Sequence, residues 1–284
     1  MRKKIVYIFF LVLFLISFSC QHTEKKVTTI SKPDILSSVQ KKQIPKDPLF
    51  TELENLQKDE TLGDASVGYI IMDCTKTKPQ VVAEYNPTQK FIPASTQKLL
   101  TTGAALELLG NQVARQVIMT NLNSLNWLAN RLLRKVGENF YGKRENDYGC
   151  KAVMEFWKNK GIDVTGMMMY DGCGLSKDNS LTPKQLIDVL YYMTLSPHFP
   201  VFYSSLPLSG ISGTLHRYMK GTPAEGMIHA KTGTVNGVKS FAGYVNTLSG
   251  KKLIFAIIVN NFTCRTKVVK KKLENVMIRM AEYN

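Results

Sequence analysis

The spacing of apolar residues changes along the chain from a strand-like period to a helical one and then back again. Short apolar runs predict strands at 67–72, 81–85, 227–232, 240–246 and 253–260. A Lys-Thr-Lys-Pro turn at 76–79 separates the first two runs, so we expect these two strands to form a hairpin.

Helical spacing occupies much of the chain around and between these strands. We predict helices at 49–53, 95–109, 128–136, 151–160, 183–193 and 267–283. Gly110 is suited to end the second helix, because glycine adopts the left-handed C-cap conformation at little cost. This arrangement predicts an α/β (α+β) fold. Its antiparallel sheet is closed by the N- and C-terminal segments and flanked by helices, with a helical subdomain.

The first twenty residues have the pattern of an export signal. Three cationic residues at 2–4 precede an apolar run at 5–18, which is shorter than the roughly 20 residues that span a bilayer. Cys20 follows a small residue, as in a lipoprotein signal whose new terminus is acylated. We therefore predict a signal peptide at 1–20, lipidation at Cys20 and export to the periplasm. The alternative is an ordinary uncleaved anchor.

Polar composition divides the rest of the chain into two parts. Residues 21–46 are rich in Lys, Thr, Ser and Gln without an apolar period, which predicts a flexible tether. Residues 47–284 then form the folded domain. The formal net charge is +15, and no basic stripe interleaved with aromatic residues is present. We therefore expect no nucleic-acid partner, and an anionic cell wall or lipid surface suits the charge better.

Cysteine and histidine spacing gives no sign of a metal site. The five cysteines form no C-x-x-C pair and the chain has only four histidines, so we predict no metal and no other cofactor. Cys74 and Cys264 lie in or beside apolar strands and are expected to be buried free thiols.

Candidate chemistry appears in three short motifs, which are Ser95-Thr96-Gln97-Lys98, Ser124-Leu125-Asn126 and Lys231-Thr232-Gly233. The S-x-x-K pattern also occurs at Ser38/Lys41 and at Ser249/Lys252, so its spacing alone is not specific. Only the pattern that starts at Ser95 opens a helix-forming stretch.

The Ser95 motif is suited to nucleophilic catalysis. A spacing of three places Ser95 and Lys98 on one face of a helix, with the free N–H groups of the helix terminus close by. The helix is otherwise apolar, and burial lowers the pKa of a lysine, which would let Lys98 act as the base that activates Ser95. The alternative is that Ser95 caps a core helix and Lys98 points into solvent.

The other two motifs add substrate-binding groups. On an edge strand, Lys231 offers a cation and Thr232 a hydroxyl, while Gly233 leaves room for a substrate backbone. Thr234 then supplies an N–H to the oxyanion. Ser124 is expected to relay a proton to the leaving group, and Asn126 to bind Lys98 and the substrate amide. The alternative is that Ser124 or Asn126 caps the helix that begins near Leu128.

In combination these motifs resemble those of the penicillin-recognising serine acyl-transferases. Longer segments are similar to the class C low-molecular-mass penicillin-binding proteins, the D-alanyl-D-alanine carboxypeptidase/endopeptidases. The similar segments are Phe91–Leu100, Asn123–Ala129, Asp171–Asn179, Leu206–Leu215 and the segment through Thr234. Cys173 stands where a serine is usual in that family. The resemblance covers most of residues 64–262.

The resemblance implies a β-lactamase/transpeptidase-like fold and a serine carboxypeptidase-like catalytic domain at 47–284. Ser95 would attack the D-Ala-D-Ala carbonyl of peptidoglycan stem peptides with Lys98 as the general base. Lys231 and Thr232 would hold the terminal carboxylate, and β-lactams would acylate Ser95 as inhibitors. The expected protein is periplasmic and lipid-anchored to a membrane.

One spacing departs from the family. Ser124 follows Ser95 by only 29 positions (124 − 95), where the family usually inserts whole domains. One alternative is therefore a non-catalytic, lipid-anchored protein that binds peptidoglycan. A second alternative is a serine β-lactamase. The sequence from Glu155 to Asn159 matches the E-x-x-x-N motif, which supplies the deacylating glutamate in such enzymes.

Overall fold

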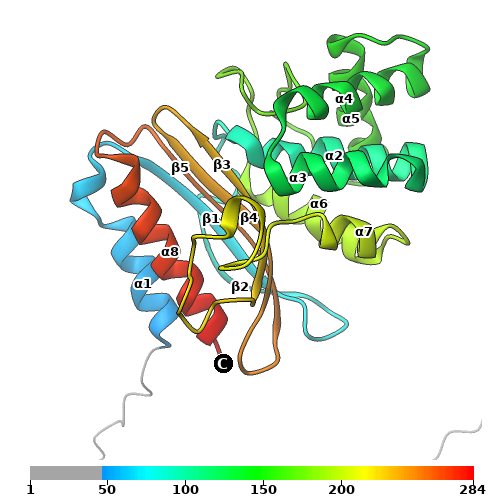
Figure 1. Ribbon diagram of the computed structural model, residues 1–284. Helices are drawn as coiled ribbons and strands as arrows, with labels where there is room; N and C mark the ends of the chain where they lie inside the picture. The colour runs from blue at the N-terminus through cyan, green and yellow to red at the C-terminus, as the bar shows by residue number, and fades with distance from the viewer. Residues whose placement is uncertain (1–46) are drawn as a thin grey trace, which may run out of the picture. The chain divides into compact units, whose positions relative to one another are not determined.

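The computed structural model describes residues 47–284, which form a five-stranded antiparallel sheet with helices on both faces (Figure 1). The strands follow the order β2-β1-β5-β4-β3 across the sheet. Their bounds are β1 Ser66–Asp73, β2 Gln80–Tyr85, β3 Ile228–Val235, β4 Val238–Asn246 and β5 Lys252–Asn260. The pairing of β1 with β5 joins the two ends of the domain, as predicted.

Strand β5 lies at the centre of the sheet because its side chains are apolar on both faces. Its sequence is Lys-Leu-Ile-Phe-Ala-Ile-Ile-Val-Asn, and every residue after Lys252 is buried. A strand with both faces covered needs no alternation of polar and apolar residues. Strands β2 and β3 form the two edges, and this leaves one side of β3 available to other groups.

Helices α1 (Pro48–Gln57) and α8 (Thr266–Glu282) lie side by side on one face of the sheet (Figure 1). The buried residues of α8 recur every three or four positions, as expected for a helix that packs one face on a core. They are Val269, Leu273, Val276, Met277, Met280 and Ala281.

The other face is covered by the remaining helices (Figure 1). Their bounds are α2 Lys98–Leu109, α3 Ala114–Asn123, α4 Asn126–Tyr141, α5 Asn146–Asn159, α6 Pro183–Leu195 and α7 Phe199–Ser204. Helix α2 is buried on all sides over its first nine residues, so it forms the centre of this helical layer. The indole nitrogen of Trp157 on α5 donates to the Leu100 carbonyl at 3.1 Å, which fixes α5 against α2.

The predicted strands and six predicted helices are present, with boundaries shifted by a few residues. The helices α3 and α7 were not predicted. The apolar residues of α3 are interrupted by Arg, Gln, Thr and Asn, and α7 has only six residues. Ser95 lies in a 3-10 turn, Ala94–Gln97, rather than in the α-helix that follows it.

Two further predictions concern the cysteines and the N-terminus. The four cysteines in the described part of the chain are free thiols, and Cys74 and Cys264 are half-buried rather than fully buried. The predicted signal at 1–20, its Cys20 and the tether at 21–46 lie outside the described residues. Within 47–284, every helix is too short or too polar to cross a lipid bilayer.

Candidate active site

Ser95 and Lys98 are aligned by the change from a 3-10 turn to an α-helix. In a 3-10 turn the side chains at i and i+3 lie one above the other. Lys98 is the first residue of α2, and its Nζ lies 2.9 Å from the Ser95 Oγ. Lys98 is fully buried, so the alternative in which it points into solvent is wrong.

The backbone in front of Ser95 is strained. Ala94 has a φ of 49°, a left-handed conformation that non-glycine residues rarely adopt. The neighbouring Pro93 carbonyl is held by two buried hydroxyls, since Thr96 Oγ1 and Ser240 Oγ each donate to it at 2.7 Å. These bonds fix the turn against strand β4 and so determine where Ser95 points.

Three oxygen atoms surround the Lys98 amine. They are the Ser95 Oγ at 2.9 Å, the Asn126 Oδ1 at 2.8 Å and the Cys173 carbonyl at 2.7 Å. Two of these can only accept hydrogen bonds, whereas the serine hydroxyl can also donate. A neutral amine satisfies all three contacts, because it gives its two N–H groups to Asn126 and Cys173 and turns its lone pair toward Ser95.

The surroundings favour this neutral form. Burial lowers the pKa of Lys98 to about 8, while the charges of Cys173 and Asp171 act in the opposite direction. A lysine with that pKa is present in both forms near neutral pH, as a general base requires.

The contribution of Cys173 was not predicted from the sequence, although its segment had been singled out. The Asp171 carboxylate accepts hydrogen bonds from four backbone N–H groups. Its Oδ1 accepts from Cys173 at 2.9 Å, Gly174 at 2.6 Å and Leu175 at 3.3 Å, and its Oδ2 accepts from Ser176 at 2.7 Å. The Gln97 amide also donates to the Asp171 carbonyl. Asp171 therefore folds this loop into a rigid turn that holds the Cys173 carbonyl against Lys98. The signal was the Asp-Gly-x-Gly pattern, which is typical of a tight turn.

The Ser124-Leu125-Asn126 motif lies beside Lys98 and Lys231, although only a short span of chain separates it from Ser95. Ser124 ends helix α3 in a left-handed conformation (φ 55°), and its Oγ lies 2.9 Å from the Lys231 Nζ. Asn126 contacts Lys98, as described above. Neither residue is the N-cap of α4, because Leu125 occupies that position. The capping alternative is therefore wrong, and helix α3 bridges the span.

The third motif lies on the edge strand β3, where side chains alternate between two faces. Lys231 points to the helical face and meets Ser124, while Thr232 points to the other face, where its Oγ1 donates to Thr214 Oγ1 at 2.9 Å. A Cβ on Gly233 would lie 2.1 Å from Ser240 Oγ and 3.0 Å from the Ser95 nitrogen. The missing side chain therefore lets β3 lie directly against the Ser95 turn.

The backbone of β3 leaves hydrogen-bonding groups free on its open side. The Ala230 N–H donates to the Pro207 carbonyl at 3.0 Å, which lies on the side away from β4. Because N–H directions alternate along a strand, those of Thr232 and Thr234 point out of the same edge. An extended peptide would meet these groups beside Ser95.

Lys231 is fully buried, and its pKa is well below the usual value. Burial is the main cause, and the positive charges of Lys98 and Lys239 add to it. No carboxylate oxygen in residues 47–284 lies within 4.0 Å of this amine. An anion bound here would restore the charged form.

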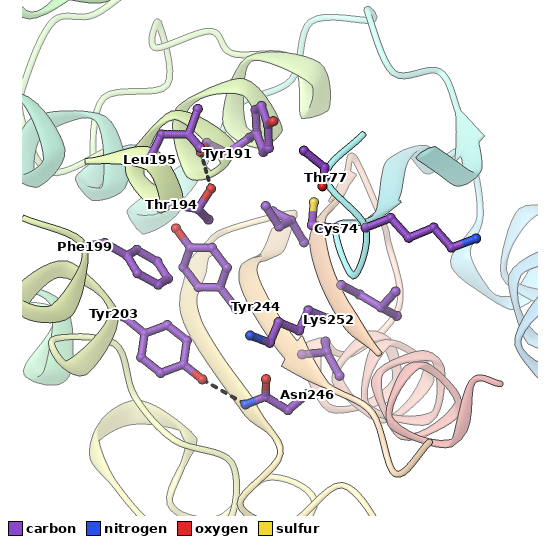
Figure 2. A pocket seen from close by; sticks show the side chains of 14 residues that line it. Cys74, Thr77, Tyr191, Thr194, Leu195, Phe199, Tyr203, Tyr244, Asn246 and Lys252 are labelled. Carbon is purple, nitrogen blue, oxygen red and sulfur yellow. Dashed lines mark hydrogen bonds between the residues drawn. The ribbon is translucent and has the colours of Figure 1, made fainter. Parts of the chain in front are cut away.

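Two features lie away from this site. Glu155, the candidate deacylating residue, accepts a hydrogen bond from Tyr141 within the helical layer, and no hydrogen bond joins it to another residue of the described domain. A pocket of about 590 Å³ lies at the opposite end of β4, with Phe199, Tyr203 and Tyr244 in its wall (Figure 2). No group of three or more metal-ligating side chains is present between residues 47 and 284.

Curated proteins with similar sequences carry related names. The chain is 33% identical over 165 residues to a D-alanyl-D-alanine carboxypeptidase of Actinomadura sp. (strain R39), a match that covers 56% of this chain and 30% of that protein. It is 30% identical over 142 residues to the D-alanyl-D-alanine carboxypeptidase DacB of Haemophilus influenzae, covering 49% and 29% of the two chains. The matched part therefore spans about a third of the length of these relatives.

Solved structures share the fold at low sequence identity. Penicillin-binding protein 4 (dacB) from Haemophilus influenzae, complexed with a β-lactam, superimposes with a TM-score of 0.73 at 14% identity, covering 82% of this chain and 100% of that one. The TLA-3 extended-spectrum β-lactamase gives a TM-score of 0.65 at 16% identity, covering 84% and 98%. The fold is therefore β-lactamase/transpeptidase-like, as expected.

A family model supplies the remaining comparison. The model of the D-Ala-D-Ala carboxypeptidase 3 (S13) family matches residues 49–117 and 114–283, which is nearly all of the described domain. The chain therefore belongs to the D-Ala-D-Ala carboxypeptidase 3 (S13) family.

Proposed function

We propose that this chain is a serine D-Ala-D-Ala carboxypeptidase/endopeptidase that acts on peptidoglycan stem peptides through an acyl-enzyme on Ser95. One observation carries the proposal. The buried Lys98 Nζ lies within hydrogen-bond distance of the Ser95 hydroxyl and of two carbonyl oxygens, which can take both N–H groups of the neutral amine. This arrangement prepares Ser95 for deprotonation without a histidine.

Acylation begins when Lys98 accepts the Ser95 proton. The Ser95 Oγ attacks the carbonyl between two D-alanines, and the N–H groups of Ser95 and Thr234 receive the negative oxygen. Lys231 and Thr232 hold the terminal carboxylate, which supplies the counterion that the buried Lys231 lacks. Asn126 fixes Lys98 and receives the substrate amide.

The leaving amine needs a proton when the C–N bond breaks. Ser124 lies 2.9 Å from Lys231 and is suited to deliver that proton to the departing D-alanine. Water then attacks the ester on Ser95 and releases the shortened peptide. A β-lactam opens on Ser95 by the same acylation step, but its amine stays attached, which makes it an inhibitor.

The alternatives have less support. A serine β-lactamase of the type predicted needs Glu155 beside the ester, whereas that carboxylate is bonded to Tyr141 in the helical layer. The non-catalytic alternative was motivated by the short span after Ser95, and helix α3 now accounts for that span.

Covalent labelling with a fluorescent penicillin tests the proposal. We expect the wild type to be labelled and Ser95→Ala to remain unlabelled. Ser249→Ala is the matched control, because Ser249 belongs to another S-x-x-K pattern, is exposed, and has its hydroxyl bonded to the Thr247 hydroxyl and the Tyr283 carbonyl. Mass spectrometry of a muropeptide ending in D-Ala-D-Ala should show loss of one D-alanine. An unlabelled wild type that also releases no D-alanine would reject the enzyme.

We also propose that the domain is exported to the periplasm and anchored by a lipid on Cys20. Support comes from the cationic and apolar residues before Cys20 and from the proposed cell-wall substrate. Metabolic labelling with a fatty-acid analogue should mark the wild type and not Cys20→Ser. Equal labelling of the two would reject the anchor.

A further inference from the structure

Lys239 is a buried cation on β4, directly across the strand pair from Thr234. Only 3% of its surface is exposed. Its Nζ donates to Thr234 Oγ1 at 2.6 Å and to the Tyr218 hydroxyl at 3.2 Å. The ring of Phe241 lies beneath it, with its centroid 4.8 Å from the Nζ.

Within the described domain, this ammonium has no acidic partner. No carboxylate oxygen among residues 47–284 lies within 4.0 Å of Lys239, and the same is true of Lys98 and Lys231. A buried charge without a counterion is costly, and well-packed apolar residues often serve stability better. Burial also lowers the pKa of Lys239 to about 8, with a smaller effect of Lys270. A purely structural position would favour methionine or leucine.

The two buried lysines lie on opposite faces of the same strand edge. Lys231 contacts Ser124 on the helical face, and Lys239 contacts Thr234 on the face that carries α1 and α8. Thr232 and Thr234 share the second face because they are two positions apart. Thr234 is exposed, and its backbone N–H points out of the open edge. The edge therefore lies between two lysine amines.

The direction of the hydrogen bond at Thr234 determines what its hydroxyl can do. Because Lys239 is a donor only, its N–H occupies a lone pair of Thr234 Oγ1. The hydroxyl proton of Thr234 is then free to be donated to an anion at the edge. A bond donated by a charged group also makes the hydroxyl a stronger donor.

We propose that Lys239 is a positioning residue that makes the site selective for acyl donors with a free carboxylate, by orienting and polarising the Thr234 hydroxyl toward that carboxylate. The inference rests on the proposed function. It adds a second cation, on the face opposite Lys231, to the groups that recognise the substrate anion.

The test compares acylation by benzylpenicillin with acylation by its methyl ester, which lacks the anion. The wild type should prefer the free acid. In Lys239→Met we expect acylation by the free acid to slow about tenfold to hundredfold, the range for a lost charge-assisted hydrogen bond, and the ester rate to change little. A purely structural lysine would slow both compounds equally, and that result overturns the proposal.

Three further variants sharpen the result. Lys270→Met removes a neighbouring charge that lies on the Tyr218 ring, and it should keep the wild-type preference. Lys239→Arg should restore most of the preference. Thr234→Val removes the exposed hydroxyl on which Lys239 is proposed to act, so it tests the proposal even if Lys239→Met does not fold. It should reduce the preference about as much as Lys239→Met does, because Lys231 and Thr232 still hold the carboxylate, and adding Lys239→Met to it should cost little more.

The outcomes separate the two proposals. If the wild type is acylated but shows no preference for the free acid, or if Thr234→Val retains the full wild-type preference, the role of Lys239 is wrong while the enzyme remains. If the wild type is acylated by neither compound, the proposed function itself fails and this role fails with it.

Discussion

The two ends of strand β4 differ in ways that separate the candidate active site from the pocket of Figure 2. Near its start, Ser240 and Lys239 lie beside the Ser95 turn and β3. Near its end, Tyr244 and Asn246 line the 590 Å³ pocket of Figure 2. From Ser240 to Asn246 the strand covers about 20 Å at its usual rise per residue.

Two polar side chains in the pocket wall form hydrogen bonds within the protein. The Tyr244 hydroxyl donates to the Leu190 carbonyl at 2.9 Å. The Asn246 amide donates to the Tyr203 hydroxyl at 3.0 Å, as Figure 2 shows. Its lysines, Lys76 and Lys252, are exposed to solvent. Water therefore solvates these two charges, and they need no bound anion.

The groups near Ser95 form hydrogen bonds too, but their charges lack partners. Within residues 47–284, the buried amines of Lys98, Lys231 and Lys239 have no carboxylate oxygen within 4.0 Å. Two non-glycine residues beside them, Ala94 and Ser124, have left-handed backbones. Both features cost free energy that the rest of the fold must offset. Left-handed backbone also occurs at Asn86, Met219 and Asn261, so the buried amines without carboxylate partners, rather than strain or the volume of a pocket, distinguish the candidate site.

The largest expected effect comes from removing the base. Lys98→Met keeps the length of the side chain but cannot accept the Ser95 proton, so acylation by penicillin should fall by about 10²–10⁴-fold. Lys252→Met makes the same substitution at the pocket and should leave the rate unchanged. Stopped-flow acylation of both variants measures the difference. Equal rates in the two variants would remove Lys98 from the mechanism.

The pH profile of the wild type provides an independent check on the same amine. Because burial holds the pKa of Lys98 near 8, the neutral base becomes more abundant as the pH rises. Acylation should therefore rise about tenfold per pH unit below that pKa and level off above it. A rate that stays flat between pH 6 and pH 9 would contradict a titrating lysine.

A smaller effect is expected from the turn that supports Ser95. Gly174 has a φ of +82°, and a Cβ there would lie 1.8 Å from the Ala94 carbonyl oxygen. Gly174→Ala must displace the Cys173 carbonyl or the Ser95 turn, so acylation should fall by about tenfold or more.

Gly142→Ala is the matched control for this turn. Gly142 has a φ of +69° but has no atom within 4 Å of the Cβ position. Gly142→Ala should lose about 1–2 kcal/mol of folding free energy to backbone strain, and its acylation rate should stay at the wild-type value. Parallel melting curves and acylation rates separate the two variants, and a normal rate in Gly174→Ala would show that the turn tolerates the shift.

The sequence predicted the elements with strong periodicity and several side chains that meet around Ser95, among them Lys98, Asn126 and Lys231. Ser240, whose hydroxyl holds the carbonyl of Pro93, was not singled out. Strand β5 and helix α8 were found because their apolar residues repeat at the expected spacing. The Cys173 carbonyl and the role of Asp171 were not found, because a backbone oxygen carries no side-chain signal. Lys239 was not singled out either. Its position across from Thr234 depends on the register of β3 and β4, which a motif does not contain.

The smallest effect is expected at the far end of β4, where Tyr244→Phe removes one buried hydroxyl. The Leu190 carbonyl loses a hydrogen-bond donor, which should cost about 1 kcal/mol and lower the Tm by about 2–4 °C. Tyr85→Phe, which removes the hydroxyl of an exposed tyrosine on β2, should leave the Tm unchanged. Acylation should stay at the wild-type rate in both, because the pocket shares no hydrogen bond with the groups around Ser95 in the described domain. If Tyr244→Phe slowed acylation more than its loss of stability explains, the two ends of the strand would be coupled and the contrast between them would have to be abandoned.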